Sequence, residues 1–269
     1  MIVLDADSDD FVIVEGLPTH TRPGTLSLSF DGTHLVFLAR QDDNSEPMRI
    51  VLHSLATGGR WEAEAHEYRQ AALAVDGTQV AVLADASGGT AMAALGSESV
   101  GVILIDTATA KPRLLWSTDG YAEDSSISWS PDGQLLAATY LTLDDVLTTA
   151  VLDLSGTVIG LYPERVALPG AHSVWISNRE IIVYPEPDDV SPLTSLNVST
   201  GRERHFTRRS FDGYLAISGR RQVRRGASAG QFVTADLNDG DERPFLTFEP
   251  AMDIMALDTV PSNAGTMAA

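Results

Sequence analysis

The alternation of apolar and polar residues along the chain predicts β-structure, and residues 125–140, SSISWSPDGQLLAATY, carry the clearest example. Ile127 and Trp129 point to one side of an extended strand, and the serines between them point to the other. The Pro-Asp-Gly sequence at 131–133 favours a tight reversal, because proline fixes φ, aspartate bonds the turn backbone and glycine tolerates positive φ. The returning strand is almost continuously apolar, which is typical of a strand covered on both faces. The stretch therefore predicts a β-hairpin within stacked sheets.

The same hairpin pattern recurs along the chain. An Asp-Gly pair, replaced by Asn in one copy, marks each predicted reversal: Asp31, Asp76, Asp132, Asn178 and Asp212. Successive reversals are 45, 56, 46 and 34 residues apart. These spacings are close to the roughly 40 to 45 residues of a four-stranded propeller blade. A repeat of this period indicates units that bury their faces against one another.

Each copy is followed by a second predicted hairpin that ends on an aromatic residue. These residues are Trp61, Trp116, Tyr162, Phe206 and Phe245. The repeating unit is thus two hairpins, or four strands, with turns rich in Gly, Thr, Asn and Asp. Residues 1–16 have the pattern of a second hairpin without a first, and Met252–Asp258 supplies a candidate inner strand at the other end.

We therefore predict an all-β fold, a β-propeller of six four-stranded blades that forms a single domain over residues 1–269. A composite blade made from the N- and C-terminal segments would close the ring and remove the sheet edges that an open array exposes. The repeat also allows five or seven blades. Trp129 and Trp175 lie on predicted inner strands, where packing between blades is the expected role of a large aromatic side chain.

Two of the repeated phrases, SWSPDGQLLA at 128–137 and LSFDGTHLVF at 28–37, resemble the WD40-like repeats of the TolB propeller family. The resemblance extends over most of the chain and implies the propeller architecture. It leaves the activity open, because related propellers serve as periplasmic scaffolds, as gating domains of prolyl oligopeptidases and as sensor ectodomains.

Composition narrows the class of protein. Apolar residues make up 43% of the chain, as in a soluble globular protein, and no apolar run approaches the roughly 18 to 20 residues of a membrane-spanning helix. The absence of cysteine excludes disulfides, thiolate metal sites and cysteine nucleophiles. The acidic N-terminal segment lacks the basic region of a secretory signal. We therefore expect a cytoplasmic protein, or an extracytoplasmic one if a leader has been removed from the sequence.

The formal net charge of −19 makes nucleic acid and anionic membranes poor partners, since clustered Lys and Arg bind phosphate groups. Residues 200–225 differ from the rest, because they carry eight arginines. Four of these form a predicted basic patch: Arg220, Arg221, Arg224 and Arg225. Such a run is most often a solvated surface, but it also fits a docking patch for an acidic partner or for a second copy of the chain.

A ring of blades brings the starts of its inner strands together at one mouth of an axial channel, where polar side chains converge. Counting back from each reversal places seven residues at this mouth: Arg22, Tyr68, Arg69, Asp124, His172, Arg208 and Asp253. This set suits a peptide end, a carboxylate or a metal ion, and it fits a salt-bridged channel lining equally well. Acidic loops such as 141–146 and 185–190 are expected on the same face.

These features favour a non-catalytic propeller that recognises a protein or peptide at the loop face and the channel mouth. The first alternative is a small-molecule hydrolase, lyase or isomerase, with Asp124 and His172 as base and acid or as two ligands of one metal ion. The second alternative is a stand-alone relative of a peptidase gating propeller. The sequence requires no cofactor, although Asp5–Asp10 and Asp236–Glu242 would suit weak surface calcium sites. The oligomeric state stays open.

Overall fold

The computed structural model of the chain is built from antiparallel β-sheets, which confirms the predicted all-β class. The residues it describes are 2–4, 11–13, 20–21, 27–29, 33–40, 48–65, 68–85, 98–167, 175–184, 192–209, 214–218, 221–225, 231–236 and 242–247. Over these residues there is no helix with the length and apolar character needed to cross a membrane.

The described strands form six sheets, which we number in chain order. Sheet 1 contains β1 (Ile2–Leu4) and β2 (Phe11–Ile13). Sheet 2 contains β3 (His20–Thr21), β4 (Ser27–Leu28), β5 (His34–Arg40), β6 (Met48–Ser54) and β7 (Arg60–Ala65). Sheet 3 contains β8 (Tyr68–Leu73), β9 (Gln79–Asp85), β10 (Ser99–Asp106) and β11 (Pro112–Asp119). Sheet 4 contains β12 (Tyr121–Trp129), β13 (Leu135–Leu141), β14 (Leu147–Asp153) and β15 (Val158–Pro163). Sheet 5 contains β16 (Val166–Ala167), β17 (Trp175–Ser177), β18 (Glu180–Tyr184), β19 (Pro192–Asn197) and β20 (Glu203–Arg209). Sheet 6 contains β21 (Tyr214–Ser218), β22 (Arg221–Arg225), β23 (Gln231–Asp236) and β24 (Glu242–Thr247).

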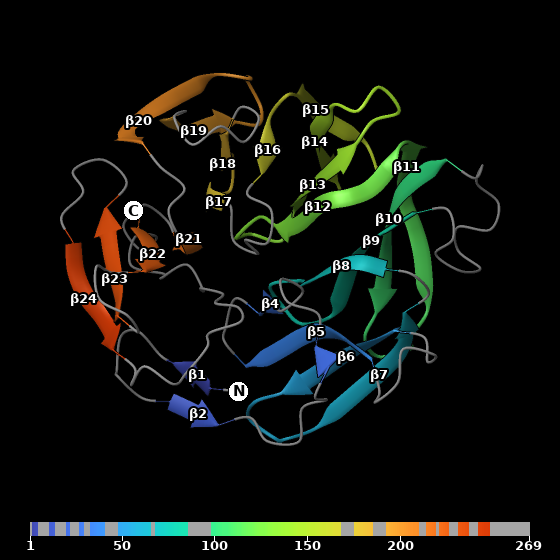
Figure 1. The fold of residues 1–269 in the computed structure, drawn as a ribbon. Helices are drawn as coiled ribbons and strands as arrows, with labels where there is room; N and C mark the ends of the chain where they lie inside the picture. The colour runs from blue at the N-terminus through green and yellow to red at the C-terminus, as the bar shows by residue number, and fades with distance from the viewer. Residues whose placement is uncertain are drawn as a thin grey trace, which may run out of the picture.

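The sheets are arranged around a common centre (Figure 1), and in sheets 2 to 6 the strands follow one another from the centre to the rim. The strands nearest the centre are β4, β8, β12, β17 and β21, and those at the rim are β7, β11, β15, β20 and β24. In sheets 2 and 5 the inner strand is split, so that two short strands pair with the same neighbour. This arrangement is that of propeller blades.

The predicted N-terminal hairpin is confirmed, because β1 pairs antiparallel with β2. The closing strand expected near Met252–Asp258 lies outside the described residues. The composite blade, the count of six blades and the single domain over the whole chain therefore stay predictions.

Two of the predicted reversals, at Asp76 and Asp132, have the expected geometry. Gly77 and Gly133 adopt φ values of +71° and +66°, a region that glycine occupies without steric cost. The Asp132 Oδ1 accepts a hydrogen bond from the backbone N–H of Gln134 at 3.1 Å. The sequence pattern therefore predicts these turns through the chemistry that forms them.

The reversal predicted at Asp212 is wrong as the turn of an inner hairpin. The first described strand of that sheet, β21, begins only at Tyr214, and its partner is β22, with Ser218 opposite Arg221. The chain thus reverses after Ser218, which stands 40 residues beyond Asn178 and so restores the repeat period. An Asp-Gly pair fits a loop between sheets as well as a hairpin, so it does not place the strands by itself.

The hydrophobic core lies between successive sheets. Leu83 of sheet 3 and Leu136 of sheet 4 belong to one buried cluster, and Val151 of sheet 4 and Ile181 of sheet 5 belong to another. The middle strands β9, β10, β13 and β14 are buried along almost their whole length. Their continuous apolar sequences follow from burial on both faces.

Two tryptophans connect neighbouring sheets at the inner strands, as expected from their positions in the sequence. The Trp129 Nε1–H donates to the carbonyl oxygen of Ala72 in sheet 3 at 3.1 Å. The Trp175 Nε1–H donates to the Ser128 Oγ in sheet 4, also at 3.1 Å, and both partners are buried. Equivalent positions in two consecutive repeats thus link sheet 4 to sheet 3 and sheet 5 to sheet 4.

Replacing Ser128 with alanine tests this connection. The Trp175 N–H would remain buried without its acceptor, so we expect Ser128→Ala to lower the free energy of unfolding by about 1–3 kcal/mol, measured by urea denaturation. Ser117→Ala is the matched control, because Ser117 is half-buried and its hydroxyl bonds no other described residue. Equal effects of the two changes would contradict the assigned role of the hydrogen bond.

Candidate functional site

The propeller has two opposite faces, because neighbouring strands run antiparallel. We call one the turn face: it carries the connections within the hairpins, at 55–59, 74–78, 107–111, 130–134, 154–157 and 198–202. The other is the loop face, which carries the connections between hairpins and between sheets. Its described residues include Asp85, Glu98, Asp119, Asp144 and Asp145. The predicted channel mouth belongs to the loop face.

Two of the seven residues predicted for the mouth have described side chains, and both start β8 at the loop face. Tyr68 is only 3% exposed and packs into the core cluster shared by sheets 2 and 3. Burial raises the pKa of its hydroxyl above the usual value. Arg69 is half-buried, and its Nε and Nη2 donate to Asp85 Oδ2 at 3.2 and 3.0 Å. The Arg69 guanidinium is thus held by a carboxylate at the end of the adjacent strand.

The remaining predicted residues are described less fully. Asp124 is the fourth residue of β12, the inner strand of sheet 4. Arg208 lies in β20, the outer strand of sheet 5, and not at the start of an inner strand, which follows from the misplaced reversal at Asp212. Outside the described residues lie Arg22, His172, Asp253 and Arg220. The other members of the basic patch are in the second strand of sheet 6, β22: Arg221, Arg224 and Arg225.

Carboxylates on the turn face are used to form turns. The Asp106 Oδ1 accepts hydrogen bonds from the Thr109 N–H and hydroxyl, both at 2.8 Å. The Asp153 Oδ1 accepts hydrogen bonds from the Ser155 hydroxyl at 2.6 Å and from the Ser155 and Thr157 N–H groups. Hydrogen bonds from the Thr109 and Ser155 hydroxyls are the largest cause of the lowered pKa values of Asp106 and Asp153.

Carboxylates on the loop face are arranged differently. Five of them are exposed and make no side-chain hydrogen bond or ion pair with another described residue: Glu98, Asp119, Asp144, Asp145 and Glu164. Another, Asp85, holds Arg69. The five exposed carboxylates therefore face solvent without forming hydrogen bonds to their own turns, and their negative charge can attract cationic groups.

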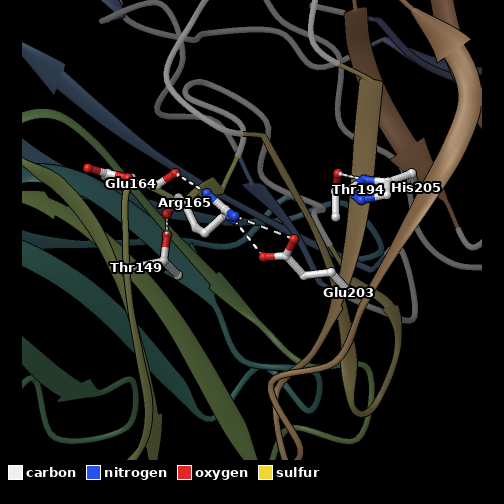
Figure 2. A network of polar contacts seen from close by, with 6 residues as sticks. All are labelled: Thr149, Glu164, Arg165, Thr194, Glu203 and His205. Carbon is white, nitrogen blue, oxygen red and sulfur yellow. Dashed lines mark hydrogen bonds and ion pairs between the residues drawn. The ribbon is translucent and has the colours of Figure 1, made fainter.

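A polar network joins sheets 4 and 5 where the chain passes from β15 to β16 (Figure 2). The Thr149 hydroxyl donates to the carbonyl oxygen of Arg165 at 2.6 Å. The Arg165 guanidinium binds the Glu203 carboxylate through Nε to Oε1 at 2.6 Å and Nη2 to Oε2 at 3.4 Å. The hydroxyl of Thr194 in β19 and the Nδ1 of His205 in β20 lie 3.0 Å apart. Because Glu203 holds Arg165, this cation does not neutralise the exposed Glu164 beside it.

The outer strand β15 carries apolar side chains that face solvent, a feature that the hairpin pattern alone does not predict. Val158, Ile159 and Leu161 are 41%, 43% and 54% exposed. In the sequence, the signal is the absence of charge from VIGLYP, residues 158–163, at the outer edge of a sheet.

No group of three or more His, Asp or Glu side chains that could hold a metal ion occurs among the described residues. The two acidic stretches suggested for weak calcium binding, Asp5–Asp10 and Asp236–Glu242, lie largely outside them. The described residues therefore indicate no metal site.

Neither a family model nor a curated protein matches the sequence. Solved structures do match. TolB from Acinetobacter baumannii is 16% identical with a TM-score of 0.62, over 92% of this chain and 59% of that one. A putative TolB from Agrobacterium tumefaciens is 16% identical with a TM-score of 0.60, over 90% and 86%. The propeller domain of the Trilobed protease from Pyrococcus furiosus is 12% identical with a TM-score of 0.56, over 85% and 72%.

These similarities show that the chain has a TolB-like β-propeller fold. The same fold also matches an acylaminoacyl peptidase, an oligogalacturonate lyase from Vibrio parahaemolyticus and a chain of the nidogen/laminin complex, with TM-scores of 0.52 to 0.56. The chain spans 39% of the length of that peptidase. At 11 to 16% identity, these matches establish the architecture and no activity.

The turn-face carboxylates generate a pH-dependent prediction. Because the pKa of Asp153 is lowered in the folded state, its contribution to stability is complete above the unfolded value of about 4 and is lost as the pH falls through the folded value. We expect Asp153→Ala to destabilise the protein at pH 7 and the difference from wild type to shrink below about pH 4. Urea denaturation at a series of pH values measures this difference.

The matched control is Asp153→Asn, which keeps an acceptor oxygen without the charge. Asn197 already fills the equivalent role in sheet 5, where its Oδ1 accepts from the Ser199 and Thr200 N–H groups. The control should retain much of the stability at pH 7. A difference between wild type and Asp153→Ala that does not change with pH would contradict the assigned role.

Proposed function

We propose that the chain is a non-catalytic propeller that binds a protein or peptide partner at the loop face, including the channel mouth. The single observation that carries the proposal is the unequal use of carboxylates on the two faces. On the turn face they bond the backbone of their own turns, whereas on the loop face five described carboxylates are exposed and engage no described residue. Carboxylates of the second kind are suited to a cationic partner.

The charge of the molecule favours a cationic partner at the loop face. The chain carries a formal charge of −19, so a cationic partner is attracted at long range and an anionic one is repelled. Three cations described near this face, Arg49, Arg69 and Arg165, are held by Glu62, Asp85 and Glu203. Complementary charge of this kind raises the rate of association and selects among partners.

The comparisons support a protein partner in general terms. One matching chain comes from the nidogen/laminin complex, which is an assembly of two proteins. The peptidase and lyase matches have the same fold at similarly low identity, so they favour neither chemistry. Binding is therefore the function that the described surface supports best.

A peptide selection tests the proposal. Peptides selected from a random-sequence display library on the immobilised protein should be enriched in Lys and Arg. Neutralising the loop face with Glu98→Gln, Asp119→Asn, Asp144→Asn and Asp145→Asn should weaken the tightest selected peptide about tenfold at low ionic strength, measured by fluorescence anisotropy.

The control makes the same change of charge on the turn face, away from β15: Asp76→Asn, Asp106→Asn, Asp132→Asn and Glu180→Gln. Asparagine and glutamine each retain an acceptor oxygen, as Asn197 does in wild type, so this variant should fold and should bind the peptide nearly as tightly as wild type. A selection that yields no peptide above background, or equal weakening by both variants, would overturn the proposal.

A further inference from the structure

Among the described outer strands of the larger sheets, one carries no charged residue along its edge. An outermost strand leaves half of its backbone N–H and C=O groups without a partner strand, and proteins generally guard such edges with charged residues or proline. In four of the five larger sheets the outer strand carries charge: β7 (RWEAEA), β11 (PRLLWSTD), β20 (ERHFTRR) and β24 (ERPFLT). In sheet 4 the outer strand is β15, VIGLYP, which has no charged residue, so its protection is limited to a bulge at Ile159 and to Pro163 at its end.

The two faces of β15 differ. Toward sheet 5, the Tyr162 ring lies across Gly160, where any side chain would overlap it, and the Tyr162 hydroxyl donates to the carbonyl oxygen of Val198 at 2.8 Å. Successive side chains of a regular strand alternate between faces, so Leu161, which stands between Gly160 and Tyr162, points away from the Tyr162 ring. Ile159 and Leu161 are left exposed, at 43% and 54%. Tyr162 thus fixes the strand while its other face and its edge stay accessible.

Acidic residues stand at both ends of this strand. Asp153 precedes the turn that leads into β15, and Glu164 follows Pro163 directly. The Glu164 N–H donates to the carbonyl oxygen of Leu147, which places Glu164 beside the connection that carries Asp144 and Asp145. The cation that follows Glu164, Arg165, is bound to Glu203. The edge is therefore apolar in its middle and negative at both ends.

We propose that β15 accepts an extended segment of a partner protein as an added strand. The charges at the ends of β15 favour a segment with Lys or Arg at both of its ends, and the exposed side chains of Ile159 and Leu161 favour apolar residues at alternate positions between them. The inference rests on the proposed function for the nature of the partner, a protein, and adds the surface and the mode of recognition.

The register of β15 limits the length of the added strand. Val158 lies opposite Leu152 and Gly160 opposite Val151, so Ile159 is the extra residue of a bulge. A bulge raises the local twist and interrupts regular pairing. Pro163, which lacks an N–H, ends the strand. The partner segment therefore pairs mainly with the backbone from Ile159 to Tyr162.

A synthetic peptide of alternating valine and threonine with lysines at both ends is the probe. We expect it to bind wild type in fluorescence anisotropy, and we expect Leu161→Lys, which places a charge on the edge, to weaken binding about tenfold or more. Methylating alternate backbone nitrogens of the peptide removes its N–H donors and should abolish binding. Replacing its lysines with glutamates should do the same.

Ala56→Lys is the matched control. Ala56 is exposed in the turn between β6 and β7 of sheet 2, so this change adds the same charge at an exposed position away from β15. It should weaken the valine–threonine peptide less than threefold, roughly 0.6 kcal/mol by the relation between affinity and free energy. Equal weakening by both lysine variants would mean that charge alone is sensed and would overturn strand addition.

Three further results separate this inference from the proposed function. Unchanged binding of the N-methylated peptide would overturn strand addition while leaving protein binding intact. If Leu161→Lys abolished self-association seen by sedimentation velocity without affecting the peptide, the occupant would be a second copy, and the inference would be wrong. If the loop-face variant lost its library-selected peptide while the valine–threonine peptide bound no variant, the proposed function would stand and the inference would fall.

Discussion

Burial of both faces of each sheet is the constraint on which this fold depends. The middle strands of sheets 3 and 4 are apolar along nearly their whole length, and they are covered because a neighbouring sheet packs against each face. A single four-stranded unit would leave two apolar faces in water, so stability comes from the stack and not from the repeat alone. The buried Trp175–Ser128 hydrogen bond fits this scheme, because it adds direction to an otherwise non-directional contact.

This constraint also decides where function can reside. The faces of the sheets are buried against one another, so the surfaces that can bind a partner are the turn face, the loop face and the edges of the outer strands. On the turn face Asp106 and Asp153 are engaged by their own turns. At the rim most outer strands carry charge, which discourages pairing with other chains. The loop face and β15 are the surfaces at which carboxylates or apolar side chains remain available.

The sequence predicts the parts of this arrangement that local chemistry controls. The turns at Asp76 and Asp132 form because Asp and Gly satisfy the turn backbone directly, whatever the rest of the chain does. Strand pairing depends on distant partners, so the same Asp-Gly signal at Asp212 predicted the wrong hairpin. Side-chain roles are less predictable still. Tyr68 is buried by strands of another sheet, and Arg69 is held by Asp85, sixteen residues away in sequence. Neither contact leaves a local pattern.

Charge on the whole molecule explains how an uncharged edge such as β15 can be tolerated. Two edges must approach to about 4.8 Å before they hydrogen-bond, whereas charges repel over a Debye length of about 8 Å at physiological ionic strength. Two copies at −19 each therefore repel one another before their β15 strands can pair. The same field attracts a cationic segment. Most outer strands are protected from pairing by their own charged side chains, whereas β15 is protected by the net negative charge of the whole molecule. This charge repels a second copy of the chain and attracts a partner of opposite charge.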